Sequence, residues 1–471
     1  MARMNLFDAI RTRSVAWSEH NAVRSSTAVT TFAELLQQAD RLADALQRAG
    51  LKTGAGFGVV DRNSVEFIIG MLAGLKCGAV VLPIANNLTA PEQEQIIEET
   101  GVHLVIREAE DGAITIGQRR YGVQRFDRAQ QHIAPHVPDA AFIRFTSGTT
   151  GTSKGVIIGH RSAIERVEAA NQGLQLGPDD AVVWVLPMAY HFVVSVMLYL
   201  YFGTTIVLSE DFTAAEILRA AATSGATLLY ASPMHVRMLV SDQACTSLGS
   251  LKRVISTSAG TSVELCRRFN DKFGQPVCQA FGIIEVGLPI INLRNAADHP
   301  EAVGHALRDY DVAVLNDDLE MLADGATGQL AVRGPGMFDG YLQPPALRSS
   351  VLRNGWFLTG DLATRSPDGL LTIAGRSKSV INVAGNKVFP EEVEAALCTH
   401  PAVDACHVIG GKHPLFGEVV EADVVLFAGT SADAEELIAH CRKRLAAYKL
   451  PQRIRFVRAL ELTATGKVKR S

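Results

Sequence analysis

The segment FTSGTTGTSKGV, residues 145–156, decides how the rest of this chain is interpreted. Its three glycines let the backbone turn and bring N–H groups close to an anion, while hydroxyl side chains and a lysine add donors and positive charge. It follows the apolar run 141–145, which predicts a buried strand. We therefore predict a loop that binds phosphate groups. The residues predicted to form it are Thr146, Ser147, Gly148, Thr149, Thr150, Gly151 and Lys154.

The order of residues in this segment differs from the common P-loop. That motif needs Gly, then Lys, then Ser or Thr, and the corresponding positions here hold Ser153, Lys154 and Gly155. A kinase or GTPase of the P-loop class therefore loses its main support. A surface loop rich in Ser, Thr and Gly is the other alternative, but such loops rarely place a lysine and glycines in this order after a buried strand.

Composition describes a globular protein with a large core. The chain has 471 residues, of which 47% are apolar and 20% charged, which allows two or three domains. A net charge of -4 gives no general attraction to nucleic acid or to anionic membranes. Seven cysteines without a CxxC pair predict buried thiols rather than disulfides or a zinc site. The start of the chain lacks the features of a signal peptide, so we expect a cytoplasmic location.

One long uncharged stretch tests the expectation of a protein without a membrane span. Residues 181–209 contain no Asp, Glu, Lys or Arg, and this length could cross a bilayer. Pro187, His191 and Gly203 interrupt the stretch. We therefore predict a buried strand at 181–186, a turn, a core helix at 192–202 and a second strand at 204–208.

Helix starts and short apolar runs alternate along the first part of the chain. A Thr or Asn cap with Glu three residues later marks three helix starts: Thr31 with Glu34, Asn63 with Glu66, and Thr89 with Glu92. The intervening apolar runs predict strands at 57–60, 79–82 and 103–106. Such alternation favours an α/β fold of mainly parallel sheets covered by helices, with ligands at the carboxyl ends of the strands.

A single carboxylate, Glu285, interrupts the apolar segment QAFGIIEVG at 279–287. An acidic side chain in such surroundings needs a cation or a hydrogen-bond network, because an unpaired buried carboxylate is costly. Mg²⁺ held between Glu285 and nucleotide phosphates would meet that need. The alternative is a glutamate at a strand end that simply faces water.

The character of the sequence changes twice towards its end. From residue 310, short alternating strands predict a β subdomain, in which Asp361 of WFLTGDLA follows a glycine at an apparent strand end and could accept hydrogen bonds from two ribose hydroxyls. After Gly375, helices at about 390 and 432–447 and strands at 406–409 and 422–427 predict a small α+β domain. We thus predict a large domain at 1–375 and a C-terminal domain at 376–471.

Basic residues gather in this last segment. Seven of them fall between Arg442 and Arg458. They indicate either a solvated helix face or a docking surface for an anionic partner.

Taken together, these segments resemble the adenylate-forming superfamily of acyl-CoA and aryl-CoA ligases. The resemblance rests on five segments in the family's order: FTSGTTGTSKGV, the GYL of GPGMFDGYL, FLTGDLA, GRSKSVINVAGNKVFPEEVE and TGKVKR. It implies a two-step reaction. A carboxylate and MgATP first give acyl-AMP and pyrophosphate, and a thiol then displaces AMP. The thiol would belong to coenzyme A or to the phosphopantetheine arm of an acyl carrier protein.

The resemblance also implies a role for each motif residue. Thr146 and its loop would hold the β- and γ-phosphates, and Glu285 would hold Mg²⁺. The residues implied for adenine and ribose are Phe281, Gly282, Ser258, Ala259, Gly260, Asp361 and Arg376. Lys467 would neutralise the substrate carboxylate and the α-phosphate as these anions meet, and His191 would lie near that carboxylate. Lys378 would be the hinge of a mobile C-terminal domain, and Gly385 would begin the loop that lines the thiol tunnel.

Some positions depart from the family's pattern. Ile284 stands where the family commonly has a threonine that contacts the α-phosphate, so one donor is missing. Thr257 and Ser258 replace a glycine pair beside the pockets for the base and the acyl group. A nucleotide-binding protein with weakened catalysis therefore remains an alternative.

The substrate is predicted from the segment LPMAYHFVVSVMLYLYF at 186–202, which has no acidic residue to pair with an amino acid's ammonium group. A fatty or aromatic acid is therefore expected. The apolar residues predicted to line its pocket are Phe192, Val196, Ile283 and Leu288.

Overall fold

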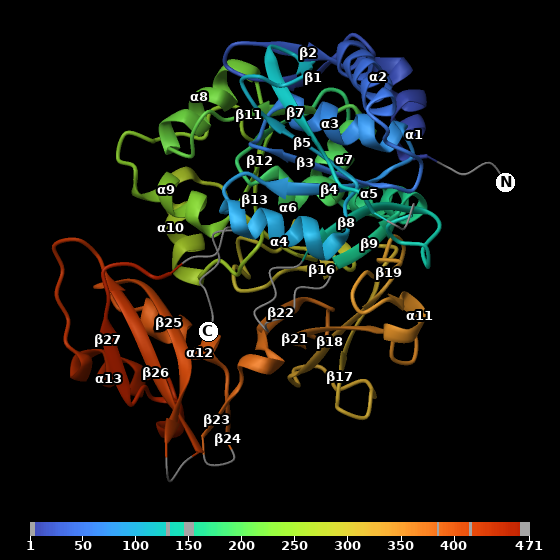
Figure 1. Cartoon of the computed structure of the whole chain (residues 1–471). Coiled ribbons are helices and arrows are strands. Elements are labelled where there is room, and N and C mark those ends of the chain that lie inside the picture. Colours follow the sequence, from blue (N-terminus) through green and yellow to red (C-terminus); the bar gives the residue numbers. More distant parts are fainter. Residues whose placement is uncertain (1–4, 129–131, 146–154, 384–385, 414–416, 462–471) are drawn as a thin grey trace.

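The computed structural model describes residues 5–128, 132–145, 155–383, 386–413 and 417–461. Two nine-stranded sheets form the body of the molecule, and a small four-stranded sheet and the separate sheet of residues 381–456 lie below them in Figure 1. The predicted mixed α/β architecture, with a large N-terminal part and a smaller C-terminal part, is confirmed. The predicted domain boundary between residues 375 and 376 stays a prediction.

The first large sheet holds the predicted strands at its centre, where β3, β4, β5 and β8 are parallel. Its order is β20-β19-β9-β8-β4-β3-β5-β7-β6. The bounds are β3 Gly56–Asp61, β4 Val80–Ala85, β5 Leu104–Glu108, β6 Ile114–Ile116, β7 Arg119–Arg125, β8 Ala140–Phe145, β9 Gly155–Gly159, β19 Gly340–Tyr341 and β20 Ala346–Leu347. Strands β8 and β9 are antiparallel, so the predicted phosphate loop joins two neighbouring strands of this sheet.

The second large sheet has the order β16-β15-β14-β13-β12-β10-β11-β1-β2. Its bounds are β1 Asn21–Arg24, β2 Val29–Thr31, β10 Ala181–Trp184, β11 Thr205–Leu208, β12 Leu228–Ala231, β13 Arg253–Ser256, β14 Val277–Ile283, β15 Gly287–Ile291 and β16 His305–Ala306. The neighbouring pairs from β14 across to β1 in this order are parallel, whereas β2 at one edge and β15 and β16 at the other are antiparallel to their neighbours. The turn between β14 and β15 carries Glu285.

Helices cover and separate these sheets. Their bounds are α1 Leu6–Ser14, α2 Phe32–Arg48, α3 Val65–Lys76, α4 Ala90–Thr100, α5 His160–Leu174, α6 Met188–His191, α7 Met197–Phe202, α8 Ala214–Ser224, α9 Pro233–Ser241 and α10 Val263–Phe273. The largest hydrophobic core takes in both large sheets together with the almost wholly buried α3. A second core lies under α4 on the other face of the first sheet. Burial on both faces explains why its central strands are continuous apolar runs.

Two of the three predicted helix caps are confirmed. Thr31 and Thr89 each form a reciprocal capping box with the glutamate three residues later. The prediction for Asn63 is wrong, because Ser64 caps α3 by accepting a hydrogen bond from the backbone N–H of Phe67. The Asn63 side chain instead donates to the Leu186 carbonyl and accepts from the Met188 N–H, at 2.8 Å each. A long-range contact therefore overrides the local pattern.

The uncharged stretch 181–209 forms β10, α6, a π-helical turn at Phe192–Val196, α7 and β11. The predicted core helix at 192–202 is thus present, but its first five residues are wound as a π-helix. Among the described residues, no helix is long and apolar enough to cross a membrane.

The predicted β subdomain is an antiparallel sheet of β17 Asp311–Leu315, β18 Gly328–Arg333, β21 Phe357–Arg365 and β22 Leu371–Arg376. It is coloured gold in Figure 1, near the short helix α11 Arg348–Val351.

We call residues 381–456 the C-terminal unit, because they build a separate sheet with its own core. Its elements are β23 Ile381–Val383, β24 Asn386–Val388, α12 Pro390–Cys398, β25 Val403–His413, β26 Gly417–Leu426, α13 Ala434–Arg442 and β27 Arg453–Phe456. The predicted helix at 432–447 is shorter than expected, since α13 ends at Arg442.

Candidate active site

Glu285 lies in a turn whose backbone is held from two sides. The guanidinium of Arg166, on α5, donates to the carbonyl of Ile284 at 3.0 Å and to the carbonyl of Gly336 at 2.6 and 2.9 Å. The backbone N–H of Phe338 donates to the carbonyl of Glu285 at 2.7 Å. Arg166 is only 1% exposed. These bonds fix the main chain on both sides of the Glu285 side chain.

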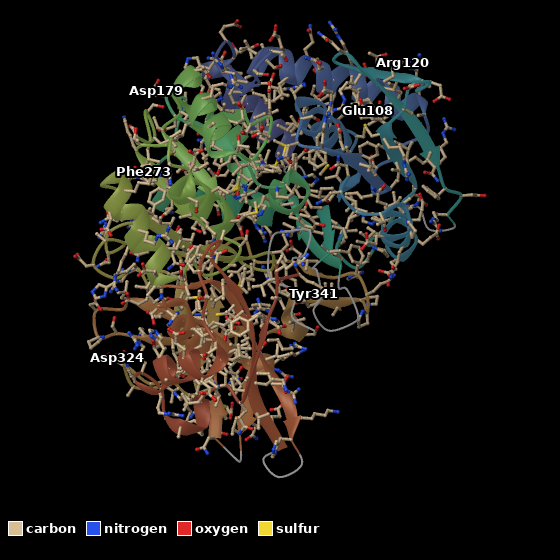
Figure 2. The ribbon with its side chains drawn as sticks, turned by 90° about the vertical axis from the view of Figure 1, so that its left-hand side faces the viewer. Glu108, Arg120, Asp179, Phe273, Asp324 and Tyr341 are labelled. Atoms are coloured by element: carbon tan, nitrogen blue, oxygen red, sulfur yellow. The ribbon has the colours of Figure 1, made fainter. Side chains whose placement is uncertain are left out.

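The Glu285 carboxyl is surrounded by groups from three other elements. The hydroxyl of Tyr341, on β19, donates to it at 3.3 Å. Burial raises the pKa of Glu285 above its ordinary value, although this hydrogen bond and the charges of Arg144 and Arg376 act in the opposite direction. Figure 2 shows Tyr341 at the level where the large body meets the lower part of the molecule. A partly buried carboxyl among cations differs from the water-facing glutamate of the alternative interpretation.

Arg144 is a site residue that sequence analysis did not identify. It lies near the end of β8, directly before the predicted phosphate loop, and its guanidinium carbon is 5.6 Å from the ring centroid of Tyr190. Burial lowers its pKa to about 10, and the charge of Glu285 opposes that shift. Within the described part of the chain its Nε atom has no hydrogen-bond partner. The sequence feature that could have identified Arg144 is its charge, which stands alone in an otherwise apolar predicted strand.

Asp361 and Arg376, predicted to bind ribose, face each other across β21 and β22. Arg376 Nε lies 2.7 Å from Asp361 Oδ1. The Asp361 side chain is 6% exposed, whereas that of Arg376 is 50% exposed and borders solvent. Asp361 is not at a strand end as predicted but in the interior of β21. Gly360 before it has φ 77°, and a Cβ there would meet no atom within 4 Å, so open space adjoins this pair.

The residues predicted to contact adenine lie on a loop and a strand end of the second sheet. Ser258 has φ 75°, a left-handed conformation that costs a non-glycine residue about 1 kcal/mol. Ser258 stands at one position of the family's glycine pair, and its backbone keeps the left-handed conformation that a glycine would adopt there. Ala259 and Gly260 are exposed, and Phe281 is partly buried at the end of β14. Gly282 lets the strands approach closely, since its Cβ would lie 2.7 Å from the Gly287 carbonyl oxygen.

His191 lies at the end of α6 in a cluster of aromatic rings. Its ring centroid is 5.8 Å from that of Trp184 and 6.5 Å from that of Tyr230, and these two rings stack at 6.1 Å. Phe192, predicted to line the acyl pocket, instead packs against Phe67 and Phe142 in the core between the sheets. Trp184 and Tyr230 were not identified from the sequence, because an aromatic residue in a buried strand is ordinary core.

Several predicted residues cannot be placed. Thr146, Ser147, Gly148, Thr149, Thr150, Gly151, Lys154, Gly385 and Lys467 lie outside the described residues. Lys378 is exposed in a 3-10 turn at Ser377–Ser379, next to Arg376. The structure thus brings Glu285, Asp361 and Arg376 into one region. Among the described residues, no group of three or more His, Cys, Asp or Glu side chains could hold a metal ion by itself.

Comparison with known proteins identifies the family of the chain. The AMP-binding enzyme family matches residues 10–342, and the AMP-binding enzyme C-terminal domain matches residues 392–467. The chain therefore belongs to the AMP-binding enzyme family. The predicted resemblance to adenylate-forming enzymes and the predicted enzyme class, an AMP-forming acid–thiol ligase, are confirmed.

Similar proteins match over nearly the whole chain. A sulfoacetate–CoA ligase of Cupriavidus necator is 30% identical over 98% of this chain and 96% of its own length. A feruloyl-CoA synthase of an Amycolatopsis species is 29% identical over 97% of this chain and 96% of its own length. Among solved structures, ATP-bound MatB of Rhodopseudomonas palustris superposes with a TM-score of 0.87 at 26% identity, over 99% of this chain and 97% of that one.

Proposed function

We propose that the enzyme activates an aromatic or apolar carboxylic acid as its acyl-AMP and transfers the acyl group to coenzyme A. The observation that carries the proposal is that Glu285 lies near both Arg144, close to the end of β8, and Arg376, which is paired with Asp361. These groups come from three sheets that meet there. They suit a nucleotide whose ribose and phosphates must be held in a fixed relation.

In the first half-reaction, a carboxylate oxygen of the acid forms a bond to the α-phosphorus of ATP, and the bond to pyrophosphate breaks. Asp361 would accept hydrogen bonds from the ribose hydroxyls, and the half-exposed Arg376 would add a donor beside them. Arg144 would contribute a positive charge next to the loop that holds the phosphates. Lys467 would neutralise the two reacting anions. In the second half-reaction a thiol sulfur bonds to the acyl carbon, and AMP leaves.

The residues around Glu285 fit a divalent cation in the presence of nucleotide. The carboxyl is partly buried, its pKa is raised by burial, and the hydrogen bond that it accepts from Tyr341 is long, at 3.3 Å. An oxygen ligand in this state is completed by a hard cation. Mg²⁺ bound between Glu285 and the phosphates would neutralise the charge that develops on pyrophosphate.

The acid class is inferred from the residues around His191. Trp184 and Tyr230 are buried aromatic rings that pack beside it, and the 186–202 segment offers no carboxylate for an ammonium group. The names of both relatives include coenzyme A but different acids. The choice of an aromatic acid therefore rests on the aromatic rings around His191 and not on the comparison.

Coenzyme A is proposed over a carrier protein because the named relatives are coenzyme A ligases, and the basic residues of the C-terminal unit add little support for a protein partner. Of the seven basic residues from Arg442 to Arg458, three form ion pairs with acids of the C-terminal unit. The pairs are Lys449 with Glu392, Arg453 with Glu421, and Arg455 with Asp423. This reduces the charge available to dock an acidic carrier protein.

A product assay tests the proposal. The protein is incubated with MgATP and a panel of aromatic, branched and straight-chain acids, with coenzyme A or a phosphopantetheinylated carrier protein. We expect AMP, pyrophosphate and a CoA thioester, with aromatic acids fastest. ADP and phosphate would indicate a P-loop-type NTPase, and ATP binding without pyrophosphate release for any acid would indicate a binding protein. The cytoplasmic location stays a prediction, which fractionation of producing cells would check.

A further inference from the structure

Two of the seven cysteines lie in contact with each other. Cys398 ends α12 and Cys406 lies on β25, and their sulfur atoms are 3.5 Å apart. A disulfide requires about 2.0 Å between the sulfurs, so both thiols are reduced here and the sulfurs would have to approach by about 1.5 Å to form the bond. The intervening segment of the chain turns back on itself, which keeps the two sulfurs together.

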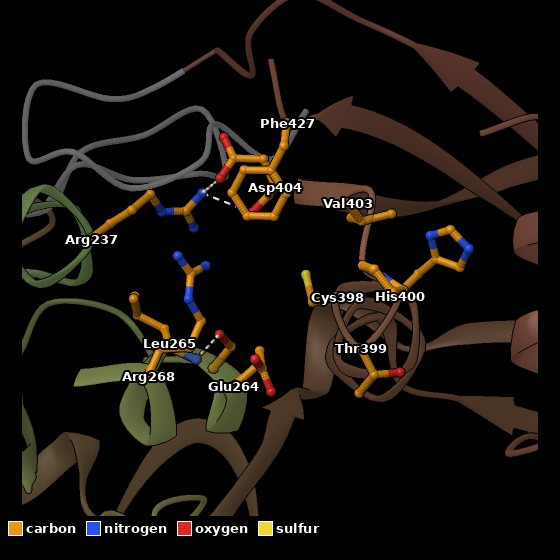
Figure 3. A pocket seen from close by; sticks show the side chains of 12 residues that line it. Arg237, Glu264, Leu265, Arg268, Cys398, Thr399, His400, Val403, Asp404 and Phe427 are labelled. Carbon is orange, nitrogen blue, oxygen red and sulfur yellow. Dashed lines mark hydrogen bonds and ion pairs between the residues drawn. The ribbon is translucent and has the colours of Figure 1, made fainter. Parts of the chain in front are cut away.

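The Cys398 sulfur borders a pocket between the C-terminal unit and the large body. The pocket has a volume of about 450 Å³ and is lined by residues of α9, α10 and the C-terminal unit. Figure 3 shows the Cys398 sulfur directed into this space, with Arg268 across from it. Cys398 is partly buried, whereas Cys406 is 9% exposed and lies in the core of the unit. A small reagent can therefore reach Cys398 first.

Electrostatics distinguish the two thiols. The hydrogen bond between the two sulfurs lowers the pKa of Cys398, and the charge of Arg237 acts in the same direction, whereas burial and the charges of Glu394 and Asp404 raise it. The pKa of Cys406 is raised by the same hydrogen bond and by burial. For the other five cysteines burial raises the pKa, for example to about 11 for Cys77 and Cys441. The pKa of Cys398 is thus lowered and that of Cys406 raised, and the Cys406 thiol also donates to the Glu394 carbonyl at 3.4 Å.

We propose that Cys398 and Cys406 are a peroxide-sensitive thiol pair, in which Cys398 is the attacking thiol and Cys406 the resolving thiol. The Cys398 thiolate attacks one oxygen of hydrogen peroxide and becomes a sulfenic acid, and the released hydroxide takes a proton to form water. The Cys406 sulfur then attacks the Cys398 sulfur and loses its proton, and the hydroxyl leaves as a second water. Two thiols and one peroxide give one disulfide and two waters, and a dithiol reductant reverses the reaction by exchange.

Mass spectrometry of the full-length protein tests the proposal directly. Both cysteines fall in the single tryptic peptide 388–412, because no Lys or Arg lies between them. After hydrogen peroxide and then iodoacetamide, we expect this peptide to be two hydrogen atoms lighter and unalkylated. Reduction should restore two alkylation sites. Cleavage before Asp404 separates the two cysteines, so a linked pair of fragments would identify the bond.

Single variants assign the roles. In Cys406→Ser the sulfenic acid at Cys398 should persist and be captured by dimedone, whereas in Cys398→Ser peroxide should leave Cys406 unoxidised. Cys441→Ala, which removes a buried thiol of the same unit, should leave the disulfide yield unchanged. Thermal unfolding of each variant checks that the unit is folded.

Other outcomes would overturn the proposal. Glutathione in the same tube serves as the control that the peroxide was active. Once it is fully oxidised, complete alkylation of both Cys398 and Cys406 would contradict the proposal. So would a disulfide from either residue to a different cysteine, or faster oxidation of Cys406 than of Cys398. Because the readout is the mass of a peptide, the result is independent of the proposed ligase reaction.

Discussion

The turn that carries Glu285 and the seam between the large body and the C-terminal unit are held by contacts of different kinds. At the turn, a buried arginine and a backbone N–H bind backbone carbonyls, which leaves the main chain little freedom. At the seam, Arg237 Nη1 donates to the Asp404 carboxylate at 2.7 Å and to its carbonyl at 2.8 Å. These side chains are 39% and 29% exposed.

The hydrogen bonds of the turn are therefore harder to break than the ion pair of the seam. Buried hydrogen bonds to main-chain carbonyls are costly to break, because the carbonyls are then left without partners. Half-exposed ion pairs are weak and are replaced by water at little cost. We infer that the turn is built to keep one shape and that the seam is built to open. The following predictions test that contrast.

The largest effect is expected for Arg166→Met. It leaves the carbonyls of Gly336 and Ile284 without their donor, so we expect a loss of about 3 kcal/mol in the free energy of unfolding and a loss of acyl-AMP formation. Urea unfolding followed by fluorescence measures the first. Arg161→Met, on the exposed face of the same helix, is the matched control and should be neutral. Equal stability of the two variants would contradict the view of a rigid turn.

Glu285→Gln removes charge from the turn while keeping its shape. Acyl-AMP formation should fall about 100-fold, the effect of losing a main electrostatic stabiliser, and the Mg²⁺ dependence should weaken. Pyrophosphate release at limiting Mg²⁺ measures both. The exposed Asp298→Asn controls for a general loss of charge. A rate that is unchanged at limiting Mg²⁺ would exclude Glu285 from the site.

The raised pKa of Glu285 predicts the direction of the pH effect. Only the ionised carboxylate binds Mg²⁺ well, and burial makes ionisation harder. Activity should therefore be fully present above the raised pKa and fall as the pH drops through it. This acid limb should begin at a higher pH than for an exposed glutamate and should vanish in Glu285→Gln. A pH profile of the first half-reaction checks both points.

At the seam, Lys378→Pro tests the hinge. Proline fixes φ near −65° and also restricts Ser377 before it, so the C-terminal unit should be trapped in one orientation. We expect acyl-AMP formation to persist and transfer to the thiol to slow several-fold. The half-reactions are measured separately, the second from supplied acyl-AMP. Transfer at the wild-type rate would show that the hinge lies elsewhere.

The smallest effect is expected for the ion pair of the seam. Arg237→Ala should change the ratio of the two half-reaction rates by no more than about fivefold, because half-exposed pairs contribute about 1 kcal/mol or less. The double variant Arg237→Asp with Asp404→Arg should restore part of the ratio, and salt should reduce the difference. If Arg237→Ala lowered the free energy of unfolding as much as Arg166→Met does, the distinction between the turn and the seam would not hold.

Local sequence signals succeeded where one short segment supplies all the interactions. The capping boxes at Thr31 and Thr89 join residues three positions apart, and both are present. Asn63 failed because its amide binds main chain more than 120 positions away, which no local pattern encodes. Arg166 was missed for the same reason. A single arginine in a helix normally faces water, and the side chain of Arg166 is buried because it packs against the main chain at Gly336 and Ile284.

The sequence alone determined the alternation of strands and helices in the large domain and singled out Glu285 and Asp361 as candidate ligands, whereas Arg376 came from the resemblance of its motif to the family. These follow from periodicity, from turn residues and from motifs that occupy short continuous stretches. Only the tertiary structure decided that Arg144 and Tyr341 approach Glu285, and that Cys398 and Cys406 touch beside the seam. Their distances depend on how sheets and helices pack, because a side chain's surroundings are set by residues remote in the chain.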